Sequence, residues 1–317
     1  MTTLSRCIAA LAIVLSPLTA QAQLAYASNE KDGTISIIDT GKDEVVGSIK
    51  AGKTPRGMAP SVDRKLLYVS DQKSNALRII DLTTRSAVRS IDLGESPEGV
   101  GRSPDGKLVA VAIEEDHQVF FIDTATEKIA FKMKVEGENP EHVVFSPDGK
   151  WALVSAEESQ VVDVIDVAAR KLAGSIRVGK RPRGIGFTPD GSRAYVACEI
   201  ANTVYAIDVA TRKVLATIPA GGRSNGIKMH PSGKEVYVSN GADGTVMVID
   251  TTSNKITSTI KVGNRPWNMA LTSDGAKLYV ANGRSNTVSV IDTTSKKELK
   301  QIKVGDQPWG VVIPGGH

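Results

Sequence analysis

Short runs of alternating apolar and polar residues recur along the chain, and glycine, proline, asparagine or aspartate separates one run from the next. The segment 180–221 illustrates the pattern, which predicts four strands near residues 184–188, 194–197, 203–208 and 214–218. Pro189-Asp-Gly191 separates the first two strands, because proline presets one turn dihedral and glycine accepts a positive one. No helix-forming pattern follows residue 22, so the sequence predicts an all-β protein.

This four-strand unit recurs seven times with almost constant spacing. An Ile-Asp pair ends the third predicted strand of each unit, and successive copies lie 42, 42, 43, 42, 42 and 42 residues apart. Its aspartates are Asp39, Asp81, Asp123, Asp166, Asp208, Asp250 and Asp292. A repeat of about 40 residues with four strands is typical of propeller blades, whose stacking buries both faces of each sheet. We therefore predict a seven-bladed β-propeller with four antiparallel strands per blade.

The two ends of the repeating region complement each other. The first unit begins near Leu24 and supplies three strands up to Ile49, whereas a single strand at 309–313 follows the last complete unit. Pairing the C-terminal strand with the three N-terminal strands closes the ring and removes open sheet edges. Residues 23–317 are thus expected to form one propeller of repeats about 42 residues long.

Residues 1–22 differ in composition from the repeats. Arg6 precedes an apolar run at 7–18 and small residues at 20–22, a pattern typical of a signal peptide cleaved after Ala22. The apolar run is too short to span a bilayer, so we expect no membrane span and a periplasmic or secreted protein. Cys198 is the only cysteine after the cleavage point, which excludes an intramolecular disulfide in the mature chain.

The second predicted strand of several units carries a recurrent Tyr-Val signature. It reads Tyr68-Val-Ser-Asp71, Tyr195-Val-Ala-Cys198, Tyr237-Val-Ser-Asn240 and Tyr279-Val-Ala-Asn282. With the valine-rich strands that end in Ile-Asp, these segments resemble the YVTN family of propeller repeats over the whole mature chain. Residues 27–32, Arg181-Pro-Arg-Gly184 and Pro308-Trp-Gly-Val-Val312 more narrowly resemble exported propellers of pyrroloquinoline quinone (PQQ)-dependent oxidation systems. This resemblance implies a PQQ-linked setting and no particular reaction.

Two sets of loops are expected to meet at one mouth of the central channel, where propellers usually bind ligands. One set precedes the innermost strands, and the other joins the second and third strands. Aligned on a proline column, the first set places these residues at one position: Arg56, Glu98, Glu141, Arg183, Asn225, Trp267 and Trp309. The next position is glycine in five units, but His142 and Asn268 in the other two. Such varied chemistry at equivalent positions predicts a binding surface.

The charged residues of this mouth suggest two sectors. The acidic sector contains Glu98, Glu114, Glu141, His142 and Glu157. The basic and aromatic sector contains Arg56, Arg181, Arg183, Arg223, Asn225, Arg265, Trp267, Asn268 and Trp309. Guanidinium groups pair with carboxylates or phosphates and indoles stack on flat rings, so the basic sector predicts a cradle for a planar anion such as PQQ or a nucleotide. The simpler role is to solvate the loop tips and cap the channel.

The acidic sector could hold a cation, with Glu98, Glu141 and His142 innermost. Its loops show no fixed ligand spacing, however, so solvated charge or a docking patch for a basic partner is the favoured interpretation. No metal site and no catalytic residue are assigned, and the sequence does not identify a cofactor.

The favoured function is a monomeric, non-catalytic binding propeller whose partner is a small anionic ligand or a periplasmic protein. The enzymatic alternative is a metal-dependent lactone hydrolase or lyase, with the metal as Lewis acid. Its candidate ligands are Glu98, Glu141, His142, Asn225 and Asn268. Binding of single-stranded nucleic acid is a further alternative. The small charge excess disfavours it, since 38 Lys and Arg oppose 35 Asp and Glu once Arg6 is removed. A protein-interaction platform without a small ligand also stays open.

Overall fold

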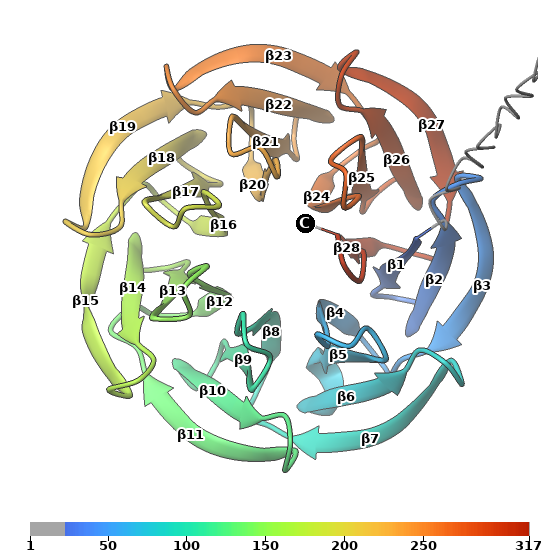
Figure 1. Ribbon diagram of the computed structural model, residues 1–317, viewed down its shortest axis with the longest axis horizontal. Coiled ribbons are helices and arrows are strands. Elements are labelled where there is room, and N and C mark those ends of the chain that lie inside the picture. The colour runs from blue at the N-terminus through green and yellow to red at the C-terminus, as the bar shows by residue number, and fades with distance from the viewer. Residues whose placement is uncertain (1–22, 317) are drawn as a thin grey trace, which may run out of the picture.

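The computed structural model describes residues 23–316, which form seven four-stranded antiparallel sheets arranged as blades around a central channel (Figure 1). The predicted signal peptide, residues 1–22, lies outside the described residues. Within the described part, the single helical element is the 3-10 turn η1 (Gln72–Ser74). The predicted all-β, seven-bladed propeller is confirmed. No helix in this part of the chain has the length and apolarity needed to cross a membrane.

Each blade has four strands that run in order from the channel to the rim (Figure 1). The innermost strands are β4 (Pro55–Pro60), β8 (Pro97–Arg102), β12 (Pro140–Phe145), β16 (Pro182–Phe187), β20 (Ser224–Met229), β24 (Pro266–Leu271) and β28 (Pro308–Val312). The second strands are β1 (Leu24–Asn29), β5 (Leu66–Asp71), β9 (Leu108–Ile113), β13 (Trp151–Ala156), β17 (Arg193–Cys198), β21 (Glu235–Asn240) and β25 (Lys277–Asn282). The third strands are β2 (Thr34–Asp39), β6 (Ala76–Asp81), β10 (Gln118–Asp123), β14 (Val161–Asp166), β18 (Thr203–Asp208), β22 (Thr245–Asp250) and β26 (Thr287–Asp292). The outermost strands are β3 (Glu44–Lys50), β7 (Ser86–Asp92), β11 (Lys128–Lys134), β15 (Lys171–Arg177), β19 (Lys213–Pro219), β23 (Lys255–Lys261) and β27 (Lys297–Lys303).

Both ends of the described chain meet in one blade. Its strand order is β28-β1-β2-β3, and β28 pairs antiparallel with β1 so that Ala27 lies opposite Val311. The predicted closure of the ring is therefore confirmed. Since the other six blades are each built from a continuous segment, this pairing closes the described ring, together with backbone hydrogen bonds from Glu30 to Gln307 and from Lys31 to Asp306 beside it.

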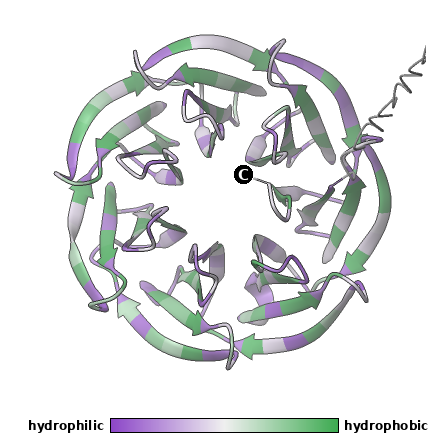
Figure 2. Cartoon of the chain, in the orientation of Figure 1, coloured by the Kyte–Doolittle hydropathy of each residue, from purple (hydrophilic) through white to green (hydrophobic). Residues whose placement is uncertain are grey.

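The hydrophobic core lies between neighbouring blades. In one buried cluster, Tyr195 and Ala197 of β17 pack with Val236 and Val238 of β21. Figure 2 shows the third strands as mainly hydrophobic, whereas the outermost strands alternate with polar residues. β-Branched and small side chains suit such flat sheets packed face to face. Packing between blades thus fixes the inner strands whose ends carry the candidate site.

The tyrosines of the repeat signature connect one blade to the next. The Tyr195 ring is fully buried, and its hydroxyl donates to Oδ1 of Asn254, in the turn after the third strand of the next blade, at 3.0 Å. Tyr279 makes the equivalent contact with Asp43 of the first blade. A buried phenol needs a polar partner at its tip, which this turn supplies.

Candidate functional site

Both predicted loop sets meet at one mouth of the channel and enclose a cavity of about 340 Å³, here called the upper cavity. Its lining consists of Glu30, Arg56, Gln72, Glu114, Glu141, Glu157, Arg181, Arg183, Asn225, Arg265, Trp267, Asn268, Gln307 and Trp309. Of the remaining predicted residues, Glu98 is fully buried against Arg56, Arg223 lies half-exposed at the rim, and His142 lies below the cavity. The structure thus brings most of the predicted side chains to one place.

A second column of residues supplies part of this lining. The residue that follows the second strand of successive blades is Glu30, Gln72, Glu114, Glu157, Glu199, Gly241 and Gly283. Sequence reasoning included Glu114 and Glu157 but missed the other polar members. The signal was available, because the same repeat alignment that finds Arg183 and Trp267 also places these residues in register.

The two glycines of this column make room for large side chains. A Cβ atom on Gly283 would lie 2.8 Å from the ring of Trp267, and one on Gly241 would lie 2.8 Å from Nη1 of Arg265. The guanidinium carbon of Arg265 lies 5.8 Å from the centre of the Trp267 ring, within cation–π range. The glycines therefore allow an arginine and an indole to occupy neighbouring places in the cavity wall.

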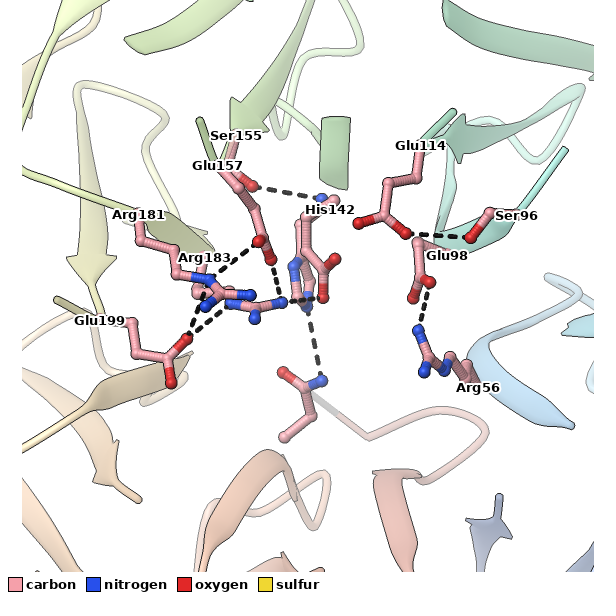
Figure 3. A network of polar contacts seen from close by, with 12 residues as sticks. Arg56, Ser96, Glu98, Glu114, His142, Ser155, Glu157, Arg181, Arg183 and Glu199 are labelled. Atoms are coloured by element: carbon pink, nitrogen blue, oxygen red, sulfur yellow. Dashed lines mark hydrogen bonds and ion pairs between the residues drawn. The ribbon is translucent and has the colours of Figure 1, made fainter. Parts of the chain in front are cut away.

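Arg183 occupies the centre of a buried ion-pair network (Figure 3). Its Nη1 lies 2.5 Å from Oε1 of Glu141 and also contacts Glu157, while its Nε donates to Oε2 of Glu199 at 3.0 Å. Burial disfavours the charged form of Arg183, but attraction by the three carboxyl groups outweighs burial and raises its pKa. The network therefore fixes a positive group at the cavity floor.

Glu199 forms ion pairs with arginines of several blades. Its fully buried carboxylate lies within ion-pair distance of four arginines: Arg181, Arg183, Arg223 and Arg265. Burial alone would raise the pKa of Glu199, but the surrounding guanidinium groups, Arg183 first, lower it to about 2. A permanent anion therefore lies inside what the sequence predicts as the basic sector.

The two predicted sectors are consequently not separate in space. Arg56 pairs with Glu98 and, at 3.0 Å, with Glu30. Arg181 donates from Nε to Glu157 at 2.8 Å. Arginines of one blade reach glutamates of a neighbouring blade, so opposite charges interleave around the mouth. A residue alignment orders side chains by blade and carries no information about how far each one extends.

Two carboxyl groups of the network hold protons more tightly than usual. Burial, assisted by repulsion from Glu141, raises the pKa of Glu157 to about 8 and that of Glu98 well above its usual value. For Glu141, burial is outweighed by Arg183 and other positive groups, so its pKa is lowered. With Glu157 largely neutral at pH 7, the five arginines of the network outnumber its other four glutamates, and the raised pKa of Glu98 shifts the charge balance in the same direction. Perturbed carboxyl groups of this kind are typical of functional sites.

Three residues on different inner strands lie between the upper cavity and the channel space beneath it, and we call them the plug: His142, Asn268 and Trp309. The His142 and Trp309 rings are stacked, with centres 5.6 Å apart and planes at 14°. Nδ2 of Asn268 lies 3.4 Å from Nε2 of His142. Burial lowers the pKa of His142, so the imidazole is neutral at pH 7. The other five blades have glycine at the position of His142 and Asn268, so only these two blades place a side chain there.

The residues proposed as metal ligands do not converge on one point. In residues 23–316, no group of three or more His, Cys, Asp or Glu side chains is placed to hold a metal ion. Glu98 and Glu141 contact arginines, and His142 belongs to the plug. Cys198 is buried, and burial raises the pKa of its thiol to about 12, which makes it a packing residue.

Fold and site together define a class of protein: a β-propeller with a polar cavity, lined by arginines and tryptophans, at one mouth of its channel. The family model of the YNCE-like beta-propeller matches residues 105–272, more than half of the chain. The chain belongs to the YNCE-like beta-propeller family. No curated protein matches its sequence.

Several solved structures share this architecture. Hydrazine synthase of Kuenenia stuttgartiensis has a TM-score of 0.79 at 23% identity and covers 89% of this chain and 99% of its own. A functionally unknown protein from Desulfotomaculum acetoxidans DSM 771 reaches 0.81 at 19% identity, covering 92% and 99%. Dihydro-heme d1 dehydrogenase NirN in complex with DHE reaches 0.70 at 16% identity, covering 93% and 76%. Likeness at these identities shows the fold alone, and one fold supports many functions.

Proposed function

We propose that this protein is a non-catalytic binding propeller whose upper cavity holds a small planar anion. One observation carries the proposal: four guanidinium groups, those of Arg56, Arg181, Arg183 and Arg265, share a cavity with two indoles. Arg183 and Arg265 supply N–H donors, while Trp267 and Trp309 supply flat apolar surfaces. A planar molecule with carboxylate groups would accept hydrogen bonds from the former and stack on the latter.

The size and charge balance of the cavity favour a small ligand over a polymer. Its volume of about 340 Å³ falls within the range of small-molecule sites, roughly 300 to 1,000 Å³. A continuous phosphate backbone at this mouth would meet Glu30, Glu114 and Glu141 as well as the arginines. Single-stranded nucleic acid is therefore less well supported than a compact anion.

The setting that we propose is a bacterial periplasm, in association with PQQ-linked oxidation. Its support is the sequence: the signal-peptide pattern of residues 1–22 and the resemblance of residues 27–32 and 308–312 to exported propellers of such systems. PQQ is flat and carries several carboxylates, so it is the first ligand to test. The proposal treats PQQ as a ligand that binds reversibly.

Calorimetric titration of the protein from Gln23 onward with PQQ tests the proposal. We expect saturable binding and a raised melting temperature, since a ligand at 100 times its Kd stabilises the folded state by about 2.7 kcal/mol. R265M and W267A should each weaken binding at least tenfold, whereas R284M, an exposed arginine outside the upper cavity, should not. Absence of binding, or equal binding by R265M and R284M, would refute the upper-cavity assignment.

A further inference from the structure

A second cavity opens where the inner strands β12, β16 and β20 end, at the mouth opposite the upper cavity. This lower cavity has a volume of about 420 Å³, and apolar side chains dominate its lining. Phe145, Phe187, Ile227 and Met229 are among them, together with prolines of the adjoining turns. The lining of the lower cavity is thus mainly apolar, whereas the lining of the upper cavity is polar.

Lys228 is the exception in this apolar wall. It lies within β20 and lines both the lower cavity and the space of about 150 Å³ in the channel beneath the plug. Equivalent positions in the other blades hold small or apolar residues: Ala59, Gly101, Val144, Gly186, Ala270 and Val312. His230, the other titratable lining residue, is engaged by Ser232 through Nδ1 at 2.7 Å.

The ammonium of Lys228 has no anionic partner among residues 23–316. Each ion pair of this part of the chain joins other residues, the Lys228 side chain is only partly exposed, and desolvation with no compensating charge lowers its pKa to about 8. A cation is costly in apolar surroundings unless an anion pairs with it. The described chain places a positive group here but no counter-ion, so a bound anionic ligand could supply the counter-ion.

We infer that the lower cavity binds an organic monoanion with an apolar body, such as an aromatic carboxylate. The carboxylate pairs with Lys228, and the apolar body packs against Phe145, Phe187 and Met229. A single cation in the wall selects a single negative charge, because a second carboxylate would be buried without a partner. This inference is independent of the ligand proposed for the upper cavity, since the plug lies between the two sites.

Calorimetric titration with 2-naphthoate at pH 7 tests the inference, with 2-naphthamide as a neutral ligand of the same shape. We expect naphthoate to bind the wild-type protein and K228M to bind it at least tenfold more weakly. K234M, which removes a lysine from the exposed turn after the same strand, should bind like wild type. Naphthamide should bind at least tenfold more weakly than naphthoate. W267A should retain naphthoate binding even if PQQ binding is lost.

Equal naphthoate affinity of K228M and wild type, no binding by wild type, or equal affinity for naphthamide would each overturn the inference. If circular dichroism shows that K228M is unfolded, acetylation of the wild-type protein decides the matter. Naphthoate should slow the acetylation of Lys228 by acetic anhydride at least fivefold, as followed by peptide mass spectrometry, and leave Lys234 unchanged. Unchanged acetylation of Lys228 at saturating naphthoate would also overturn it.

Discussion

At the scale of single residues, Glu199 shows how one buried carboxylate can organise several cations. Replacement by glutamine keeps its shape but removes the charge that four arginines share. Breaking a buried ion pair typically costs about 3–5 kcal/mol, because the partner charge is left uncompensated. We therefore expect E199Q to lower the free energy of unfolding by about 3 kcal/mol at pH 7, as measured by urea denaturation.

The control for E199Q is E158Q, which neutralises an exposed glutamate one residue after Glu157. Its stability should equal that of wild type, and wild-type stability of E199Q would contradict the prediction. Acid gives a second readout. Since folding lowers the pKa of Glu199 to about 2, its stabilising effect is present above its unfolded pKa and is lost as the pH falls toward 2. E199Q should lack the part of the acid-induced loss of stability that comes from protonation of Glu199.

The pH dependence of stability expected from Glu157 is opposite in sign to that expected from Glu199. Folding raises the pKa of Glu157 to about 8, so its contribution to stability is fully present below its unfolded pKa and disappears as the pH rises through 8. Each such proton changes the free energy of unfolding by up to about 1.4 kcal/mol per pH unit. Melting curves between pH 5 and 9 should show a smaller decline for E157Q than for wild type.

The loss of stability with rising pH should be smaller in E157Q than in wild type but should not vanish, because Glu98 also has a raised pKa and contributes with the same sign. E158Q again serves as the control and should keep the wild-type slope. If E157Q and wild type lose stability in parallel across this range, Glu157 does not hold a proton at neutral pH.

At the scale of strands, most of the architecture could be predicted because its signals are local. Alternation and turn residues predicted a strand at 184–188, and β16 spans Pro182–Phe187. The same alignment identified the mouth of the channel and most residues of the upper cavity. It could not show that Arg183 reaches Glu199, which depends on side-chain length within one blade. It also could not show that His142 stacks on Trp309, whose strands are brought together only by closure of the ring.

Closure itself gives a prediction for β28. Val311 and Ile313 pack in a buried cluster with Ala25 and Ala270, so the C-terminal strand joins the first and last blades. Deletion of residues 308–317 exposes the edge of β1 and removes this packing. We expect the melting temperature to fall by roughly 10 °C or more, as a loss of several kcal/mol implies, with new proteolytic cleavage in both blades. Differential scanning calorimetry and limited proteolysis measure these effects.

Deletion of residues 316–317 alone is the matched control, because it leaves β28 and its pairing with β1 intact. This shorter deletion should melt within about 2 °C of wild type, since it removes well under 1 kcal/mol. A protein without β28 that melts like the control would show that the other blades hold the ring closed without it.

At the scale of the whole molecule, the ring presents two unlike cavities at opposite mouths of its channel. The upper cavity is polar and the lower one apolar, and the plug of His142, Asn268 and Trp309 lies between them. The plug is built from β12, β24 and β28, and β12 lies across the channel from the neighbouring strands β24 and β28 (Figure 1). Because the plug separates the two ligands sterically, we expect neither ligand to change the affinity of the other markedly.

This arrangement predicts that the two ligands bind without competition. The Kd of 2-naphthoate, titrated calorimetrically, should change less than twofold when PQQ is saturating, and the reverse titration should agree. The H142G substitution opens the plug. Five other blades already have glycine at this position, so the ring should still fold. With the plug opened, a ligand of either cavity can enter the space of about 150 Å³ beneath it, so each ligand should then weaken the other's binding at least threefold. H117Q, a change in a loop outside the plug, should behave like wild type; competition in wild type itself would show that the cavities are joined.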